Sequence, residues 1–307
     1  MKRDTTVLKK YLHKKVVVTG GAGFIGSHLV DQLIALGANV TVLDNLATGS
    51  LKNLTHVQHQ ITFIKGDIRC FKTCLDATRD AFCIFHLAAQ VSVPESMENP
   101  FLCNEINITG TYNLLEAARL NNVSRFMFSS SCAVYGHKDI PCSETTPCNP
   151  TSVYAYSKLY GEQLCKEYSS LFSVPTLCLR YFNVFGPRQN PHGHYAGVIA
   201  KFQAQFSTNQ PITIFGNGLQ SRDFVPVQQI VQANVGLALA SSDLFTGQPI
   251  NIATGTSTSI LELFHKLKKE FPSYTFEPLF APFKKGDIVS SQAECSLYKQ
   301  LISSFAS

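Results

Sequence analysis

The sequence predicts an α/β fold, a doubly wound parallel sheet that carries a smaller C-terminal lobe. Three observations lead to this prediction. Apolar, β-branched runs alternate with amphipathic segments over roughly the first 180 residues, a pattern typical of parallel strands covered by helices on both faces. A glycine-rich turn follows the first run, and the alternation loosens after about residue 182. We therefore divide the chain into a basic extension (1–14), a main domain (15–182) and a smaller lobe (183–307) that returns some strands to the main sheet.

The expected elements follow one another along the chain. In the main domain we expect strands at 16–19, 39–43, 61–64, 82–86, 125–129 and 176–181, and helices at 24–36, about 71–79, about 101–121 and about 154–172. In the smaller lobe we expect helices at 196–208, 227–240 and 259–270, and strands at 212–215 and 250–252. The carboxyl ends of the main strands should share one edge of the sheet, where ligands of doubly wound folds bind.

Composition narrows the class of protein. The chain has 307 residues, 45% hydrophobic and 15% charged, as in a compact globular protein. It contains no apolar run of 18 residues and no secretory apolar core near its start, so we expect neither a membrane span nor a signal peptide. The net charge of +5 resides in the first 15 residues, which hold six Lys/Arg and one Asp, while the remaining charges cancel. We therefore expect a solvated, partly helical basic extension and no nucleic-acid partner.

The ten cysteines and nine histidines show no metal-ligand spacing and no Cys-x-x-Cys pair. Several of the cysteines lie inside apolar runs. Buried free thiols in a reducing, cytoplasmic setting are the expected state, without a metal site.

The glycine-rich turn has the spacing Gly20-x-x-Gly23-x-x-Gly26 and lies between an expected strand and an expected helix. Glycines there let the backbone approach a pyrophosphate, and the helix presents free N–H groups to it. The second strand ends in Asp44, 18 residues after Gly26. A carboxylate at this distance accepts from the adenosine ribose hydroxyls and repels a 2′-phosphate, so the sequence favours NAD over NADP.

Two further strand ends fit the same cofactor. Asp67 follows the strand at 61–64 and could accept from the adenine amino group. The strand at 82–86 ends in His86 and runs into Leu87-Ala88-Ala89-Gln90, where small residues let the backbone pass near the cofactor. We expect His86 itself to be a packed, hydrogen-bonded core residue.

A catalytic group is expected where the strand at 125–129 ends in a run of serines that reaches Ser131. Tyr154 and Lys158 follow, four residues apart, and therefore share one face of a helix. A lysine ammonium and a cationic nicotinamide would favour the tyrosinate and lower the pKa of Tyr154, which could then act as a base. Lys158 could also hold the nicotinamide ribose, and Ser131 could relay the substrate proton.

These motifs carry a resemblance. The sequence from Thr19 to Ser27, Asp44-Asn45, His86-Leu87-Ala88-Ala89, the serines with Val134-Tyr135-Gly136, Tyr154-x-x-x-Lys158 and Arg180-Tyr181-Phe182-Asn183 resemble the extended short-chain dehydrogenase/reductase family. Within that family the chain is most similar to UDP-hexose 4-epimerases, from about residue 15 to 295. The resemblance implies a Rossmann-type domain at 15–182 with firmly bound NAD⁺, a UDP-sugar substrate and a role in polysaccharide biosynthesis.

The implied reaction is a reversible oxidation at the sugar C4. Tyr154 would take the proton of the 4-hydroxyl while hydride passes to the nicotinamide, and the 4-keto sugar would turn over before hydride returns to its other face. The expected catalytic residues are Ser131, Tyr154 and Lys158. The expected cofactor contacts are Gly20, Gly23, Phe24, Ile25, Gly26, Asp44, Asn45, Thr48, Gly49, Asp67, Ile68, Leu87, Ala88, Ala89, Gln90, Asn107, Ser129, Tyr154, Lys158 and Tyr181. The expected substrate contacts are Ser92, Ser131, Tyr154, Asn183, Val198, Phe215, Arg222, Lys284 and Ser291.

The chain departs from the family pattern in three places. Lys284 stands where a phosphate-binding arginine is usual, so the bidentate fork is lost although the charge remains. Ser291 stands where a bulky tyrosine accompanies plain hexoses, and a small residue leaves room for an N-acetyl group, which favours UDP-GlcNAc and UDP-GalNAc. The sequence stops at Ser307, where relatives continue for another helix, so we expect a looser substrate lobe.

The resemblance also implies a homodimer formed through the helices at 101–121 and 154–172. Rival functions remain open. A UDP-glucuronate epimerase or decarboxylase of the same superfamily would need a positive or hydroxyl-rich pocket for the C6 carboxylate. A 4,6-dehydratase would carry an acid pair where this chain has Cys132-Ala133. A non-catalytic NAD-binding regulator would typically have lost the tyrosine or the lysine.

Overall fold

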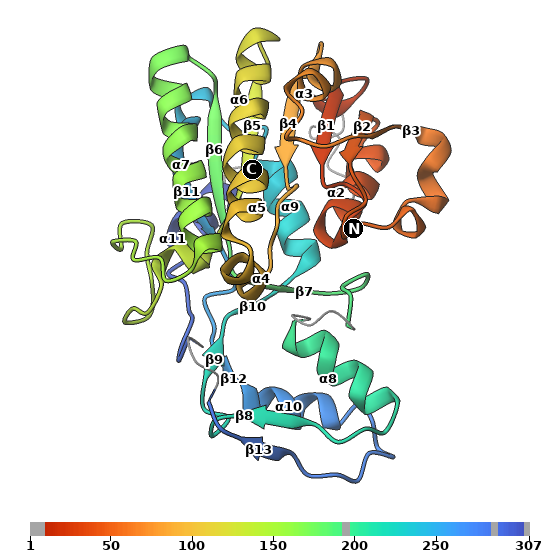
Figure 1. Ribbon diagram of the computed structural model, residues 1–307, viewed down its shortest axis with the longest axis vertical. Coiled ribbons are helices and arrows are strands. Elements are labelled where there is room, and N and C mark those ends of the chain that lie inside the picture. Colours follow the sequence, from red (N-terminus) through yellow and green to blue (C-terminus); the bar gives the residue numbers. More distant parts are fainter. Residues whose placement is uncertain (1–9, 192–196, 284–287, 304–307) are drawn as a thin grey trace.

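A seven-stranded parallel sheet organises the computed structural model, which describes residues 10–191, 197–283 and 288–303 (Figure 1). Its strands are β1 (Lys15–Thr19), β2 (Asn39–Asp44), β3 (Ile61–Lys65), β4 (Cys83–His86), β5 (Arg125–Ser131), β6 (Thr176–Tyr181) and β11 (Thr246–Ile252). They lie in the order β11-β6-β5-β4-β1-β2-β3, and every neighbouring pair is parallel. The chain builds outward from β1 in one direction and then returns to build in the other. The predicted doubly wound sheet is confirmed.

Helices cover both faces of this sheet, because successive strand residues point to opposite sides. Val16 and Val18 belong to the core under α2 (Phe24–Ala35) and α9 (Val227–Leu237). Val17 belongs to the core on the other face. That second core is covered by three helices: α3 (Phe71–Thr78), α6 (Gly110–Leu120) and α7 (Val153–Phe172). The strands are buried on both sides, which explains their continuously apolar sequences.

The helix expected at 101–121 is interrupted. It consists of α5 (Pro100–Asn104), one π-helical turn η3 (Glu105–Thr109) and then α6. Such π-turns insert extra backbone into a helix and are frequent at functional sites. The sequence pattern did not reveal this turn, because the apolar periodicity continues through it.

The smaller lobe lies beyond the carboxyl edge of the main sheet (Figure 1). Its core lies between α8 (Val198–Ser207) and α10 (Ile260–Lys268) and is rich in phenylalanine. Short strand pairs complete it: β8 (Thr213–Phe215) with β13 (Leu279–Ala281), and β9 (Ser221–Arg222) with β12 (Thr258–Ser259). A further parallel pair, β7 (Asn183–Phe185) and β10 (Phe224–Pro226), leads the chain into the lobe and back.

Several elements were not expected from the sequence. They are α4 (Val93–Glu98), α11 (Ser296–Ser303), the 3₁₀ turns η1 (Leu51–Asn53), η2 (Thr55–Gln60), η4 (Cys132–Tyr135) and η5 (Ser242–Leu244), and the short strands of the lobe other than β8. Most of them are only two to eight residues long, too short for a periodic pattern to be recognised.

The end of the basic extension differs from the expectation of a solvated segment. Residues 1–9 lie outside the described part, but Tyr11 is fully buried. Its hydroxyl donates a hydrogen bond of 2.8 Å to the carbonyl of Val235 in α9, and its ring packs edge-on against Phe82. One large aromatic side chain is enough to fix this segment to the fold, because burying it removes a large apolar area from water.

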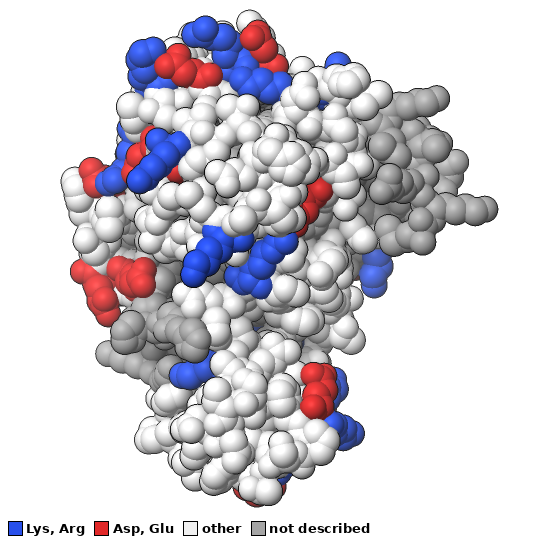
Figure 2. All heavy atoms as spheres, turned by 90° about the vertical axis from the view of Figure 1, so that its right-hand side faces the viewer, with Lys and Arg blue, Asp and Glu red and all other residues white. Residues whose placement is uncertain are grey.

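The surface and the thiols agree with the composition. Figure 2 shows one face of the molecule, on which basic and acidic residues lie among a larger area that carries neither. In the described ranges, none of the helices has the length and apolar character required to cross a bilayer. All ten cysteines are free thiols, and Cys70 is the exposed one.

Candidate active site

The glycine-rich turn forms a cradle between β1 and α2. Gly20 has a positive φ of 69°, and a Cβ placed on it would lie 2.8 Å from the backbone nitrogen of Ala88. A Cβ on Gly26 would collide with the carbonyl of Gly20. Gly23 immediately precedes α2 and has no side chain with which to cap it. The turn can therefore present the first N–H groups of α2 to an anion at close range, as a pyrophosphate requires.

Asp44 lies beside this turn at the end of β2 and is almost completely buried. One carboxylate oxygen accepts from the backbone N–H of Ala22 at 2.9 Å, and the other accepts from Leu46 at 2.8 Å. A carboxylate offers about four acceptor positions. Among the described residues, two of these positions stay available at Asp44, which is the number that the two hydroxyls of a ribose would use.

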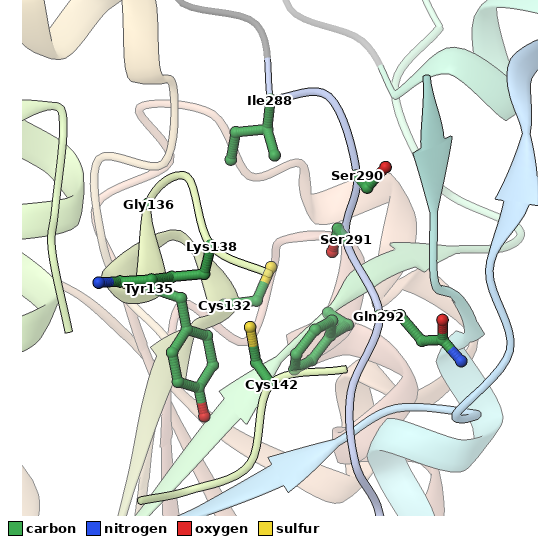
Figure 3. A pocket seen from close by; sticks show the side chains of 10 residues that line it. Cys132, Tyr135, Gly136, Lys138, Cys142, Ile288, Ser290, Ser291 and Gln292 are labelled. Atoms are coloured by element: carbon green, nitrogen blue, oxygen red, sulfur yellow. The ribbon is translucent and has the colours of Figure 1, made fainter. Parts of the chain in front are cut away.

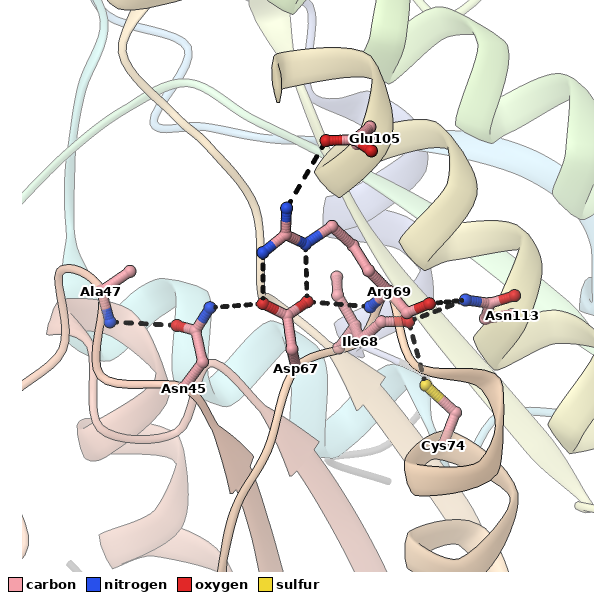
Figure 4. Close-up of polar contacts among 8 residues, drawn as sticks. All are labelled: Asn45, Ala47, Asp67, Ile68, Arg69, Cys74, Glu105 and Asn113. Atoms are coloured by element: carbon pink, nitrogen blue, oxygen red, sulfur yellow. Dashed lines mark hydrogen bonds and ion pairs between the residues drawn. The ribbon is translucent and has the colours of Figure 1, made fainter. Parts of the chain in front are cut away.

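Asp67 differs from Asp44 because its acceptor positions are filled (Figure 4). Arg69 donates to it from the backbone N–H, Nε and Nη2 at 2.9, 3.0 and 2.9 Å, and Asn45 donates from Nδ2 at 2.9 Å. The Arg69 guanidinium lowers the pKa of Asp67 to about 2. An adenine amino group could therefore donate to Asp67, as predicted, only by displacing one of these donors or by sharing an acceptor position with it.

The turn around Asp67 is held from both neighbouring helices. Asn113 in α6 donates to the carbonyls of Ile68 and Arg69 at 3.0 and 2.9 Å. Arg69 also reaches Glu105 in the π-turn at 3.5 Å. Figure 4 shows the resulting continuous row of contacts from Asn45 to Asn113.

The loop after β4 is fixed by Asn107, which is buried in the same π-turn. Its side chain accepts from the N–H of Gln90 at 2.8 Å and donates to the carbonyl of Gln90 at 2.9 Å. It is also 2.9 Å from the hydroxyl of Ser157 in α7. Asn107 thus shapes the backbone that was predicted to pass near the cofactor.

His86, just before this loop, bridges Thr19 and Thr111 at 2.9 Å on each side. Burial, and to a smaller extent the charge of Lys158, lowers the pKa of His86 to about 3. It is a neutral core residue, as expected.

The remaining predicted cofactor residues line the same edge of the sheet. Phe24 and Ile25 form the first turn of α2, Gly49 approaches Ala22 and Asp44, and Thr48 is exposed. Leu87, Ala88 and Ala89 are half-buried after β4. Ser129 and Tyr181 bond to each other at 3.1 Å, and Tyr181 bonds to Asn234 in α9. These last two hydroxyls are engaged inside the protein.

The predicted catalytic residues meet where β5 ends beside α7. The Ser131 hydroxyl is close enough to Tyr154 to oppose the rise in the pKa of its phenol. Lys158 is buried, donates to the carbonyl of Ser129 at 2.8 Å, and its Nζ lies 6.0 Å from the centre of the Tyr154 ring. The helix is fixed at this end because Ser152 caps it and Ser96 accepts from the N–H of Tyr154 at 3.1 Å.

The expected lowering of the Tyr154 pKa is not found. Burial raises the pKa of Tyr154 to about 12, and Ser131 opposes this only in part. Burial also lowers the pKa of Lys158 to about 8. Both shifts have the same cause, because a site removed from water disfavours the charged form of each group.

The predicted substrate residues surround the entrance to the smaller lobe. Asn183 donates to the carbonyl of Asp223 at 3.3 Å and to the hydroxyl of Ser291 at 3.4 Å. Val198 is the first residue of α8, Phe215 ends β8, Arg222 is half-buried in β9, and Ser92 caps α4. Lys284 lies outside the described residues.

A small cavity adjoins Ser291 (Figure 3). It is lined by Cys132, Tyr135, Gly136, Lys138, Cys142, Phe182, Ile288, Ser290, Ser291 and Gln292. Cys132, directly after Ser131, and Ser291 both belong to this lining. The cavity is therefore the space beside Ser291 on the side of Ser131, the predicted catalytic serine.

A buried ion pair that no sequence motif had indicated lies behind the predicted catalytic residues. Glu162 and Arg180 are 4–5% exposed and form two bonds, of 2.7 Å and 2.9 Å. Ser130 donates to Glu162 at 2.5 Å. Two signals were available: a charged residue inside the apolar run 176–181, and an acid four residues after Lys158 on the same helix face.

Comparison with known proteins gives this geometry a context. The family described as "NAD dependent epimerase/dehydratase family" matches residues 16–253. A relative from Methanocaldococcus jannaschii, "Putative UDP-glucose 4-epimerase", is 40% identical over 278 residues, which is 89% of this chain and 87% of the relative.

Solved structures are similar over nearly the whole chain. A UDP-N-acetylglucosamine 4-epimerase from Methanobrevibacter ruminantium, in complex with UDP-N-acetylmuramic acid, has a TM-score of 0.89 and 37% identity, covering 94% of this chain and 92% of that one. A UDP-glucose 4-epimerase from Thermus thermophilus, in complex with NAD, has a TM-score of 0.84 and 34% identity, covering 95% and 93%.

Arg69→Gln should weaken NAD binding about tenfold, or about 1.4 kcal/mol. The substitution removes the fork that holds Asp67, so the carboxylate loses two of its four donors. Isothermal titration with NAD measures the effect. Arg79→Gln is the matched control, because it breaks an exposed ion pair with Asp76 on α3. Equal affinities in the two variants would show that Arg69 does not organise the cofactor site.

Proposed function

The chain belongs to the NAD dependent epimerase/dehydratase family, and we propose that it interconverts the two C4 epimers of a UDP-sugar. The observation that carries the proposal is the meeting of Ser131, Tyr154 and Lys158 at the end of β5. These three groups lie between a glycine cradle suited to a pyrophosphate and a cavity at the entrance to the smaller lobe. The similarity to UDP-sugar 4-epimerases over nearly the whole chain supports it.

The residues present fit NAD. The glycine turn would take the pyrophosphate at the start of α2, and a Cβ on Gly20 or Gly26 would collide with the backbone of Ala88 or of the turn itself. Asp44 would take the adenosine ribose with its two available acceptor positions. The loop after β4, held by Asn107, would line the nicotinamide end. When bound, NAD⁺ supplies a hydride acceptor and a positive charge.

In the proposed reaction the chain's own groups move one proton. At neutral pH, Lys158 is mostly protonated, since its pKa is about 8. Its ammonium, 6.0 Å from the centre of the Tyr154 ring, would favour the tyrosinate, and Ser131 opposes part of the cost of burial. Tyr154 would then take the proton of the sugar 4-hydroxyl, with Ser131 orienting that hydroxyl, and would return it after the sugar has turned over.

We propose an N-acetylated sugar, as in UDP-GlcNAc and UDP-GalNAc. Ser291 borders the cavity described above, and its hydroxyl accepts from Asn183 at 3.4 Å. A tyrosine at this position would extend into that space. The similar structure that carries UDP-N-acetylmuramic acid is consistent with a site that accepts an acetylated amino sugar, whereas other relatives are named for UDP-glucose.

A uronate substrate is the second candidate, because Lys138 reaches the cavity. Figure 3 shows the Lys138 ammonium directed away from Ser290 and Ser291, so it does not face the space beside them. Because of this orientation, we favour a neutral sugar over a uronate as the substrate. A cytoplasmic location and a role in polysaccharide biosynthesis stay predictions.

We propose that the chain forms a homodimer through the continuous segment α5–η3–α6 and through α7. Large apolar side chains are exposed along these helices, among them Phe101, Tyr156 and Tyr160, which are 73%, 61% and 50% exposed. A second copy would remove them from water. Sedimentation equilibrium should give twice the mass of one chain, and a single-chain mass at micromolar concentration would contradict the proposal.

Tyr154→Phe should lower the rate of 4-epimerisation at least a hundredfold, because it removes the hydroxyl that we propose exchanges the substrate proton. Purified protein is incubated with UDP-GlcNAc, UDP-glucose or UDP-glucuronate without reductant, and the epimers are separated by chromatography. Tyr156→Phe, on the exposed side of the same helix, should keep the wild-type rate. If the wild type converts none of the three sugars, the 4-epimerase proposal is wrong, and conversion of UDP-glucuronate alone selects the second candidate.

Ser291→Tyr should lower kcat/KM for UDP-GlcNAc relative to UDP-glucose at least tenfold, since the phenol would occupy the cavity needed for the acetyl group. Turnover of UDP-glucose by the same variant is the internal control for folding and NAD binding. An unchanged ratio would mean that the acetyl group does not enter the cavity beside Ser291.

A further inference from the structure

Three consecutive serines at the end of β5 each face a different residue of α7. The Ser129 carbonyl accepts from Lys158, and the Ser130 hydroxyl donates to Glu162. The Ser131 hydroxyl is close enough to Tyr154 to oppose the rise in the pKa of its phenol. Tyr154, Lys158 and Glu162 are four residues apart and form one stripe along the helix. The strand end and the helix thus meet at three successive positions, of which only two involve proposed catalytic groups.

The third position is the most rigid of the three. Glu162 receives two bonds from Arg180 besides the bond of 2.5 Å from Ser130. Arg180 stands beside Ser130 in the register of β5 and β6. Its Nη1 donates to the hydroxyl of Tyr135 at 2.9 Å, and that hydroxyl donates to Asn251 in β11 at 2.7 Å. Glu162 is therefore bonded directly to β5 and β6, and indirectly to β11 through Arg180 and Tyr135. These bonds restrict its movement relative to the sheet.

A buried ion pair is a poor means of stabilising a fold, because the loss of hydration offsets much of the attraction. Its location gives it another use. Ser130 lies directly between the residue that accepts from Lys158 and the residue that faces Tyr154. A proton transfer needs its partners within about 2.6–3.2 Å, and a misplacement of about 1 Å can cost about a hundredfold in rate.

We propose that Ser130 and Glu162 are positioning residues, which hold the end of β5 at the distance from α7 at which Ser131 and Tyr154 can share a proton. This inference rests on the proposed function, because it assigns these two residues to the same reaction. Neither residue contacts the cavity or the glycine cradle. They act through the backbone of Ser129–Ser131.

Ser130→Ala gives the sharpest test, because it deletes one bond and leaves the Glu162–Arg180 pair intact. We expect kcat to fall about tenfold while KM for the sugar changes less than twofold, since substrate contacts are unaltered. Ser130→Thr, which keeps the hydroxyl, should restore most of kcat. Ser169→Ala is the matched control: it deletes a serine bond of 2.8 Å to Phe245 elsewhere on α7 and should leave kcat unchanged.

A wild-type kcat in Ser130→Ala overturns the inference, as does a loss that Ser130→Thr does not restore. If the wild type itself converts no UDP-sugar, the proposed function has failed, and crystal structures of the wild type and of Ser130→Ala decide the inference separately. It is supported if the Ser131 hydroxyl leaves hydrogen-bonding distance of Tyr154 in the variant. It is overturned if the Ser131–Tyr154 distance is the same in both.

Discussion

The register of the parallel strands is the constraint on which the site depends. Parallel strands end at a common edge, so β1, β4, β5 and β6 deliver their last residues side by side. Successive side chains alternate between the two faces of a strand. In β5, Ser129 reaches toward Tyr181 and the α9 side, whereas Ser130 reaches Glu162 of α7. A slip of one residue would exchange these faces and present the wrong serine to Tyr154.

Burial divides the charged groups of this edge into two kinds. Glu162 and Arg180 neutralise each other through paired bonds, which satisfy both groups away from water. Lys158 and Tyr154 have no such pairing. Lys158 donates to one carbonyl and lies near two aromatic rings. Burial raises the pKa of Tyr154 and lowers the pKa of Lys158, and thereby favours the neutral form of each group. A group that must exchange a proton needs a pKa that its surroundings can still shift. The paired bonds of Glu162 and Arg180 thus supply rigid placement, beside the two groups to which we assign the proton transfer.

The sequence was informative wherever the signal was local. Three such signals each lie within one short segment: the glycine spacing, the aspartate at the end of β2, and the four-residue spacing of Tyr154 and Lys158. They helped to predict the order of strands and helices. Contacts between distant segments were not accessible in this way. Tyr11 packs against a helix more than 200 residues away. The bonds that Arg180 donates to Glu162 could be predicted only by knowing which strands are neighbours. The pKa of Tyr154 depends on how completely the folded chain excludes water, which no motif encodes.

The two aspartates of the cofactor edge show why a motif does not determine recognition by itself. Asp44 and Asp67 both lie at or just beyond the ends of strands in the same sheet. Asp44 accepts two hydrogen bonds, both from backbone N–H groups. Asp67 accepts four, of which three come from Arg69 and one from the side chain of Asn45. The charge of Arg69 is in turn offset by Asp67 and by Glu105, so it does not create a basic site for an additional phosphate. If Asp44 holds the adenosine ribose as proposed, its two available acceptor positions suit the two ribose hydroxyls, and its negative charge would repel a 2′-phosphate.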